Sequence, residues 1–148
     1  MKLIVREATR KDIPSILNLL YELERPKPSD ASGVKLFNNK ISEYFSDSQK
    51  TIIVSEQEKE VTGFVSVIYL KRLNQVKLEM HIPELIVTKS SRKSGTGKKL
   101  MQYCINLAKQ KNCHRIRLES GNLRKDAHEF YKNIGFEQSA LSFTKHIV

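Results

Sequence analysis

The sequence predicts a mixed α/β fold, with a mostly antiparallel sheet of about six strands and helices on both faces. Three observations indicate it. Short runs rich in β-branched residues alternate with longer segments whose apolar residues recur at helical spacing. Two strand-like runs are separated only by the polar turn QEK, as in a hairpin. The length of 148 residues suits a single domain, residues 1–148, with its own hydrophobic core.

The N-terminal part is predicted to form a strand and then a helix. Residues 2–7 (KLIVRE) are rich in β-branched side chains and predict a short strand. In residues 8–24, Thr9 and Asp12 have the spacing of a capping box, which marks a helix start. One face of this helix is apolar: Ile13, Ile16, Leu17, Leu20 and Leu23.

A loop, a second helix and three strands are predicted next. Residues 25–33 hold two prolines and a glycine and predict a loop, and residues 34–45 form an amphipathic helix with Val34, Phe37, Ile41 and Phe45 on one side. Strands follow at residues 51–56, 60–73 and 75–89. Pro83 interrupts the last of these, and because proline cannot donate to a sheet ladder, it predicts either a bulge or an unpaired backbone position there.

The C-terminal part is predicted to alternate helices and strands. A helix runs from about Thr96 to Lys111, stops at Asn112, and turns four residues inward: Leu100, Cys104, Leu107 and Ala108. A strand at 114–120 and a helix at 125–136, closed by Gly135, come next. A last strand is expected at 139–148, giving the order β-α-α-β-β-β-α-β-α-β.

Composition limits the location and the partners. No apolar run approaches the ~18–20 residues of a membrane span, and the N-terminus turns polar too early for a signal peptide. Two cysteines fit reduced thiols, so we expect a cytoplasmic protein. The four histidines show no metal-ligand spacing with them. The net charge of +10 could attract an anionic partner, namely a nucleic acid, a metabolite or a phosphorylated cofactor, or it could serve solubility alone.

The loop RKSGTGKK, residues 92–99, predicts an anion site. It lies between a strand end and a helix start, where unpaired backbone amides and the helix dipole favour negative charge. Its glycines permit close approach of a ligand to the backbone. The loop is not a nucleotide-binding P-loop, because Lys99 stands where serine or threonine is required and Arg92 where the first glycine is required. It also lacks the third glycine of a dinucleotide fingerprint.

Two motifs resemble those of the GNAT superfamily of acetyl-CoA-dependent N-acetyltransferases. Arg92, Gly95 and Gly97 fit its R/Q-x-x-G-x-G/A pattern after a strand that ends in an apolar pair. The segment DAHEFYKNIGF resembles the closing pattern A-x-x-F-Y-x-x-x-G-F, which five residues match: Ala127, Phe130, Tyr131, Gly135 and Phe136. One helix and one strand separate the two motifs, as the family's fold requires. The resemblance covers nearly the whole chain, although the first half matches by pattern only.

The resemblance implies a binding site for acetyl-CoA. The pyrophosphate of coenzyme A would be held by the loop, with the residues Arg92, Lys93, Ser94, Gly95, Thr96, Gly97 and Lys98. The pantetheine arm would be bound by backbone groups of the preceding strand, at Leu85, Ile86 and Val87. In this family two central strands splay apart to admit that arm, and Pro83 lies close to the expected splay. Arg124 stands where many relatives carry asparagine, and it could reach cofactor, substrate or a nearby carboxylate.

The resemblance also suggests catalytic residues. Tyr131 matches the tyrosine that donates a proton to the departing sulfur, although by periodicity alone it is a core aromatic. Glu84 and Glu119 are equal candidates for the base that deprotonates the amine. Glu79 and His81 lie on the same strand as Glu84, and a bound water could instead relay the proton. Strand parity decides which of these side chains face the site, and a bulge at Pro83 would shift that parity by one residue.

Two other functions remain open at this stage. The charge alone would suit a nucleic-acid-binding domain, but the basic residues are scattered, no aromatic-rich recognition strand is present, and the glycine loop would go unexplained. A catalytically inert acyl-CoA sensor is the second alternative. The acceptor, a small-molecule or peptide amine, is not identified by the fold. The positive charge disfavours polycationic acceptors, and the strand expected at 139–148 could pair across a homodimer.

Overall fold

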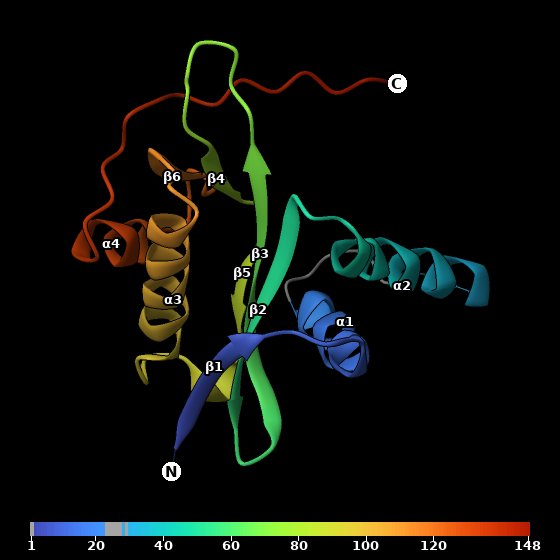
Figure 1. The fold of residues 1–148 in the computed structure, drawn as a ribbon. Helices are drawn as coiled ribbons and strands as arrows, with labels where there is room; N and C mark the ends of the chain where they lie inside the picture. The colour runs from blue at the N-terminus through green and yellow to red at the C-terminus, as the bar shows by residue number, and fades with distance from the viewer. Residues whose placement is uncertain (1, 23–27, 29) are drawn as a thin grey trace. The chain divides into compact units, whose positions relative to one another are not determined.

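The computed structural model describes residues 2–22, 28 and 30–148, and it confirms the mixed α/β fold class (Figure 1). Its contacts define two compact units, one up to Arg117 and one from Leu118 to Val148. The prediction of a single domain stays a prediction. The first unit contains β1 (Leu3–Glu7), η1 (Arg10–Asp12), α1 (Ile13–Glu22), α2 (Ala31–Ser46), β2 (Lys50–Gln57), β3 (Glu60–Leu70), β4 (Glu79–Ile82), β5 (Leu85–Val87), η2 (Lys89–Ser91), α3 (Thr96–Gln110) and most of β6 (Arg115–Leu118).

The sheet has six strands in the order β1-β2-β3-β4-β6, and β5 pairs with β3. The β1–β2, β2–β3, β3–β4 and β3–β5 pairs are all antiparallel. The predicted hairpin at QEK joins β2 to β3, where Glu58 and Lys59 have φ values of 53° and 67°. Two successive positive φ values are typical of a type I′ turn, whose twist matches that of the strands.

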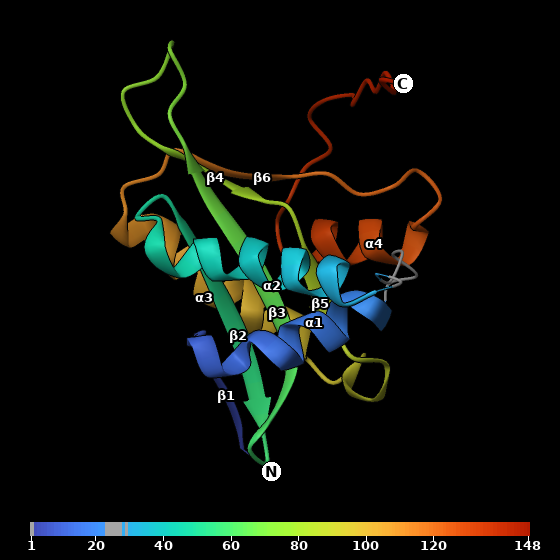
Figure 2. The same ribbon diagram turned by 90° about the vertical axis from the view of Figure 1, so that its right-hand side faces the viewer.

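Helices cover both faces of this sheet. Figures 1 and 2 show α1 and α2 on one face and α3 on the other. The face towards α1 and α2 buries one apolar cluster: Ile16, Leu17, Leu19, Ile41, Ile52, Val54, Phe64 and Ile86. Side chains alternate along a strand, so Val65 and Val67 point to the opposite face. There α3 contributes the four inward residues expected from the sequence, all of them buried, together with Met101.

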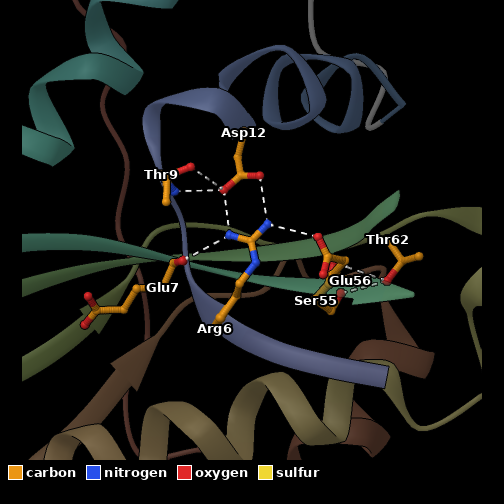
Figure 3. A network of polar contacts seen from close by, with 7 residues as sticks. All are labelled: Arg6, Glu7, Thr9, Asp12, Ser55, Glu56 and Thr62. Carbon is orange, nitrogen blue, oxygen red and sulfur yellow. Dashed lines mark hydrogen bonds and ion pairs between the residues drawn. The ribbon is translucent and has the colours of Figure 1, made fainter. Parts of the chain in front are cut away.

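The start of the first helix is fixed by the predicted capping box. The Asp12 carboxylate accepts a hydrogen bond from the Thr9 amide at 2.8 Å. Arg6 of β1 binds the same carboxylate with two nitrogens, at 2.8 and 3.0 Å, and reaches Glu56 of β2 at 3.3 Å (Figure 3). The hydrogen bond from Arg6 lowers the pKa of Asp12, because it favours the charged form. This network ties the helix entrance to the edge of the sheet.

The helix ends were also predictable. Asn112 has a φ of 56°, and after α3 the amides of Cys113 and Asn112 bond to the carbonyls of Ala108 and Lys109, at 2.9 and 3.1 Å. This pair of bonds is a Schellman motif, which needs a residue in the left-handed region.

The predicted inward face of the second helix is confirmed at Ile41, whereas Val34 is 38% exposed. Leu23 and residues 25–27 and 29 of the predicted loop lie outside the described residues, and α2 begins at Ala31, three residues earlier than predicted.

The unit from Leu118 to Val148 contains α4 (Lys125–Asn133). This helix ends at Gly135, with a φ of 98°, and a second Schellman motif joins Phe136 to Tyr131 at 2.9 Å and Gly135 to Lys132 at 3.1 Å. The prediction of a strand at 139–148 is wrong, because residues 136–148 have no regular secondary structure. Alternating apolar residues suit a strand, but a strand also needs a neighbour that completes its hydrogen bonds. The predicted strand at 75–89 is instead two, β4 and β5, which keeps the number of strands at six.

Candidate active site

A bulge separates β4 from β5 at Pro83. On one side of it His81 lies opposite Ile68, and on the other Leu85 lies opposite Val65. Two residues of β3 therefore face three residues, 82–84, which is the defining count of a β-bulge. The bulge predicted from Pro83 is thus confirmed. It shifts the facing of all later residues in the run by one position.

The shifted parity decides where Glu84 points. Without the bulge, its side chain would share the face of Met80 and Ile82. With it, Glu84 shares the face of Ile86, which belongs to the apolar cluster under α1 and α2. Glu84 is half-buried on that face.

Ser66 of β3 holds Glu84 in three ways. The Ser66 amide donates to the Glu84 carbonyl at 3.0 Å, and the Glu84 amide donates to Ser66 Oγ at 3.0 Å. Ser66 Oγ in turn donates to Glu84 Oε2. Because the Glu84 amide already uses an acceptor site of the hydroxyl, the hydroxyl proton is directed at the carboxylate. Ser66 is 3% exposed, so water competes little for these bonds.

Tyr44 of α2 completes this cluster. Burial raises the pKa of its hydroxyl, the negative charge of Glu84 raises it further, and a hydrogen bond with Ser66 acts in the opposite direction. Tyr44 and Ser66 were missed in the sequence analysis. Ser66 had a signal, because it is a polar residue within the apolar run of a buried strand. Tyr44 had none, because its contact arises only when α2 packs on the sheet.

Glu79 and His81 lie on the same face as Glu84, by their pairing with Leu70 and Ile68. His81 is half-buried, whereas Glu79 is completely buried. Burial alone would raise the pKa of Glu79, but hydrogen bonds from Arg72 and Arg115 and the charge of Arg115 lower it to about 2. Such a carboxylate is a weak proton acceptor at neutral pH, which argues against Glu79 as the base.

The backbone of β5 has one edge in the sheet and one edge outside it. The bonds between Ser66 and Glu84 at 3.0 Å, and from the Thr88 amide to Thr62 at 2.8 Å, show that even-numbered residues face β3. The amides and carbonyls of Leu85 and Val87 therefore point to the other edge. No strand pairs with that edge in the described part of the chain. Ile86 instead faces β3 and places its side chain in the core.

The loop before α3 presents unpaired amides. Within the described residues, the amides of residues 93–98 have no hydrogen-bond acceptor, and the first amide paired at this helix start is that of Lys99, with Gly95 at 3.1 Å. Lys93 and Gly95 have φ values of 62° and 88°, and a Cβ built on Gly95 would meet nothing within 4 Å. The Arg92 Nε donates to the Val87 carbonyl at 3.1 Å, which fixes the loop against the end of β5. Free amides and open space fit a bound diphosphate.

The other predicted site residues lie in the unit from Leu118 onwards. Tyr131 packs edge-on against Phe130, with ring centroids 5.3 Å apart, and against Phe136 at 5.8 Å. Burial raises the pKa of Tyr131, and the positive charge of Arg124 acts in the opposite direction. Glu119 is exposed and accepts a hydrogen bond from Ser142 at 2.7 Å. Arg124 is exposed and precedes the first turn of α4.

Cys104 is completely buried on α3, and burial raises the pKa of its thiol to about 12. It is therefore protonated at neutral pH and acts as a packing residue, as expected from its position. Within the described ranges, no helix is both long and apolar enough to span a membrane.

Comparison with known proteins decides the family. The sequence model of the Acetyltransferase (GNAT) family matches residues 17–136. The chain belongs to the GNAT acetyltransferase family. Acetyl transfer to an amine is the family's general reaction, so the protein is an acetyl-CoA-dependent acyltransferase and acetyl-CoA is its cosubstrate. The predicted family, enzyme class and cosubstrate are confirmed.

One curated protein resembles the chain in sequence, and two solved structures resemble it in fold. An aminoalkylphosphonate N-acetyltransferase of Salmonella typhimurium is 26% identical over 141 residues, which are 95% of this chain and 89% of that protein. Glucosamine-6-phosphate N-acetyltransferase of Arabidopsis thaliana has the same fold, with a TM-score of 0.83 and 20% identity over the full length of both chains. The acetyltransferase AAC(6')-Iy, solved with a bisubstrate analogue of coenzyme A, has a TM-score of 0.84 and 14% identity over both full chains.

Proposed function

We propose that the protein transfers the acetyl group of acetyl-CoA directly to the primary amine of a small acceptor, and that Glu84 takes up the amine proton. The observation that carries this proposal is the bulge at Pro83. It turns the Glu84 carboxylate to the α1–α2 face, immediately beside the free edge of β5.

The cofactor site is proposed from the loop and from β5. The amides of residues 93–98 hold the diphosphate, with Arg92 fixing the loop and Lys98 adding positive charge. The backbone groups of Leu85 and the Val87 amide bind the pantetheine arm as a neighbouring strand would, while the Val87 carbonyl is held by Arg92. Acetyl-CoA, when bound, supplies an acetyl thioester next to the bulge. Holding the two reactants together in this way contributes much of the rate.

Glu84 acts as the general base in this proposal. An amine is protonated at neutral pH and must lose a proton to become a nucleophile. Ser66 holds the carboxylate in one orientation through its donated hydrogen bond. A positioned base typically contributes ~10²–10⁴ in rate. Glu119 is the weaker candidate, because its side chain is exposed to water, whereas Glu84 is half-buried.

Tyr131 acts as the general acid. Its raised pKa keeps the hydroxyl protonated throughout the physiological range, so it can donate to the departing thiolate. Arg124 lies close enough to affect that pKa, and we assign it to the surroundings of the cofactor.

The acceptor proposed here is a small amine that also carries a negative group. The relative of Salmonella typhimurium is named for aminoalkylphosphonates, which combine an amine with an anionic phosphonate. The net charge of +10 would attract such an acceptor and repel a polycation. A cytoplasmic location and a homodimer stay predictions.

A thiol-release assay with acetyl-CoA tests the proposal. The amine panel contains aminoalkylphosphonates, amino acids, amino sugars and polyamines. We expect release with the anionic amines, and a loss of about 10²-fold or more in kcat for Glu84→Gln. Glu119→Gln is the matched control and should keep its activity. Activity that survives Glu84→Gln but not Glu119→Gln would reverse the assignment of the base, and no release with any amine would refute the proposed reaction.

A further inference from the structure

Three arginines surround one buried carboxylate at the first residue of β4. Glu79 has no exposed surface, and its oxygens accept from Arg72 at 3.0 Å, Arg115 at 2.6 Å and Arg117 at 3.3 Å. Arg115 and Arg117 come from β6, the strand beside β4 (Figures 1 and 2), and Arg72 from the chain leaving β3. One carboxylate therefore meets three guanidinium groups, which leaves two positive charges in excess.

The arginines keep donors free for another ligand. Arg115 and Arg117 each bond Glu79 through Nε, and their terminal nitrogens make no hydrogen bond within the described ranges. The exposed fraction of the side chain is 39% for Arg72, 49% for Arg115 and 34% for Arg117, so the free nitrogens can be reached from solvent. The Nε of Arg72 is buried and lacks a hydrogen-bond partner among the described residues. Buried donors are normally paired, so this nitrogen is a second and independent sign of a missing acceptor.

The cluster lies in line with Glu84. Glu79, His81 and Glu84 share one face of the sheet, and the five residue steps from Glu79 to Glu84 span at most ~17 Å along the strand. The proposed diphosphate site follows the opposite end of β5. A ligand held by the cluster would thus approach Glu84 from the side away from the cofactor's phosphates.

We propose that Arg72, Arg115 and Arg117 bind an oxyanion carried by the acceptor, a phosphate, phosphonate or carboxylate group, while the acceptor's amine reaches Glu84. Guanidinium groups match the geometry of such oxyanions and bind them with two parallel hydrogen bonds. Glu79 orients the three groups, and its single charge leaves the site positive. This inference names an acceptor subsite and rests on the proposed function.

A binding experiment tests the site without enzyme activity. Arginine Nε–H signals of ¹⁵N-labelled protein, saturated with coenzyme A to fill the loop, are followed while inorganic phosphate is added. We expect a saturable shift of the Arg72, Arg115 and Arg117 signals, with an affinity lowered about tenfold in Arg117→Gln, because a hydrogen bond to a charged group is lost. Lys2→Gln removes the same charge before β1, at the other edge of the sheet, and should change nothing. Phosphate shifts that are absent or linear overturn the site.

A kinetic experiment tests the role of the site in the reaction. Aminoalkylphosphonates of graded length are compared with alkylamines of the same length. We expect the ratio of kcat/KM between anionic and neutral amines to fall about tenfold in Arg117→Gln, through KM, and to recover in part in Arg117→Lys. An unchanged ratio overturns this inference while leaving the acetyltransferase intact, whereas absent turnover of every amine refutes the proposed function instead. Arginine shifts caused by a single-stranded oligonucleotide but not by phosphate would assign the cluster to nucleic acid.

Discussion

Ser66 and Glu84 are joined at three points, through two backbone groups and through the carboxylate. The Ser66 hydroxyl accepts from the Glu84 amide and donates to Glu84 Oε2. A β-bulge bends its strand and increases the local twist. Here the same serine closes the bulge and orients the side chain that projects from it, so the backbone irregularity and the proposed base form one structural unit.

Ser66→Ala should therefore reduce catalysis more than stability. We expect kcat to fall about tenfold, with the KM for acetyl-CoA unchanged, because the carboxylate loses its orienting donor. The free energy of unfolding should fall by about 0.5–1.5 kcal/mol for the lost hydrogen bonds. Ser55→Ala is the matched control, since Ser55 is also buried and bonds Thr62 at 2.8 Å. Equal kcat values in the two variants would remove Ser66 from its positioning role.

Gly95 separates the effect of charge from that of backbone conformation. Its φ of 88° lies in the left-handed region, where a side chain costs about 1–2 kcal/mol, and asparagine and aspartate tolerate it better than most residues. Both Gly95→Asn and Gly95→Asp should fold, but only the aspartate places a negative charge beside the diphosphate. Titration calorimetry should show much weaker acetyl-CoA binding in Gly95→Asp than in Gly95→Asn. Equal affinities would contradict the phosphate site at this loop.

Tyr131→Phe should lower kcat at least about tenfold, with little change in the affinity for acetyl-CoA, because the variant lacks the hydroxyl proposed as the proton donor. Burial raises the pKa of Tyr131 above its ordinary value of 10. The protonated form therefore persists to higher pH, and kcat should decline only as the pH rises through that raised pKa. This alkaline decline should be missing in Tyr131→Phe. A wild-type rate in the variant, or an unchanged alkaline limb, would exclude the acid role.

Glu79 should make the free energy of unfolding depend on pH in the acidic range. Its folded pKa of about 2 lies below the ordinary 4.5, so its stabilising contribution is present above 4.5 and is lost as the pH falls to about 2. The shift corresponds to about 3 kcal/mol at neutral pH. At pH 7, urea unfolding should give a free energy of unfolding for Glu79→Gln that is lower than that of the wild type by about this amount. At pH 2 the two free energies should be nearly equal. A difference that is independent of pH would show that packing, not charge, explains the loss.

Local signals in the sequence predicted much of the fold. Thr9 with Asp12, Asn112 and Gly135 mark helix ends through bonds to near neighbours, so their roles follow from spacing alone. Pro83 predicted the bulge because it lacks an amide hydrogen. The prediction of a strand at 139–148 was wrong because it did not rest on a local signal. A strand needs a pairing partner elsewhere in the chain, which its own residues do not specify.

The candidate site was predicted in part. The loop at residues 92–99 was found because a single motif contains all of its features. The partners of Glu84 were not found, because Ser66 and Tyr44 reach it from β3 and α2 only after the sheet and helix have packed. The three arginines around Glu79 come from two distant segments and were missed for the same reason. Such clusters depend on strand register, which the sequence does not state.

The extra residue at Pro83 lets this part of the gene change length without exchanging the two sides of the sheet. Loss of the Pro83 codon would leave Ile82 opposite Val67 and Glu84 opposite Ser66, in a regular ladder. Glu84 and Ile86 would keep the face towards α1 and α2, while the local bend of the strand would be lost. Homologous genes should therefore accept loss of this codon without a change in the residues that face α1 and α2.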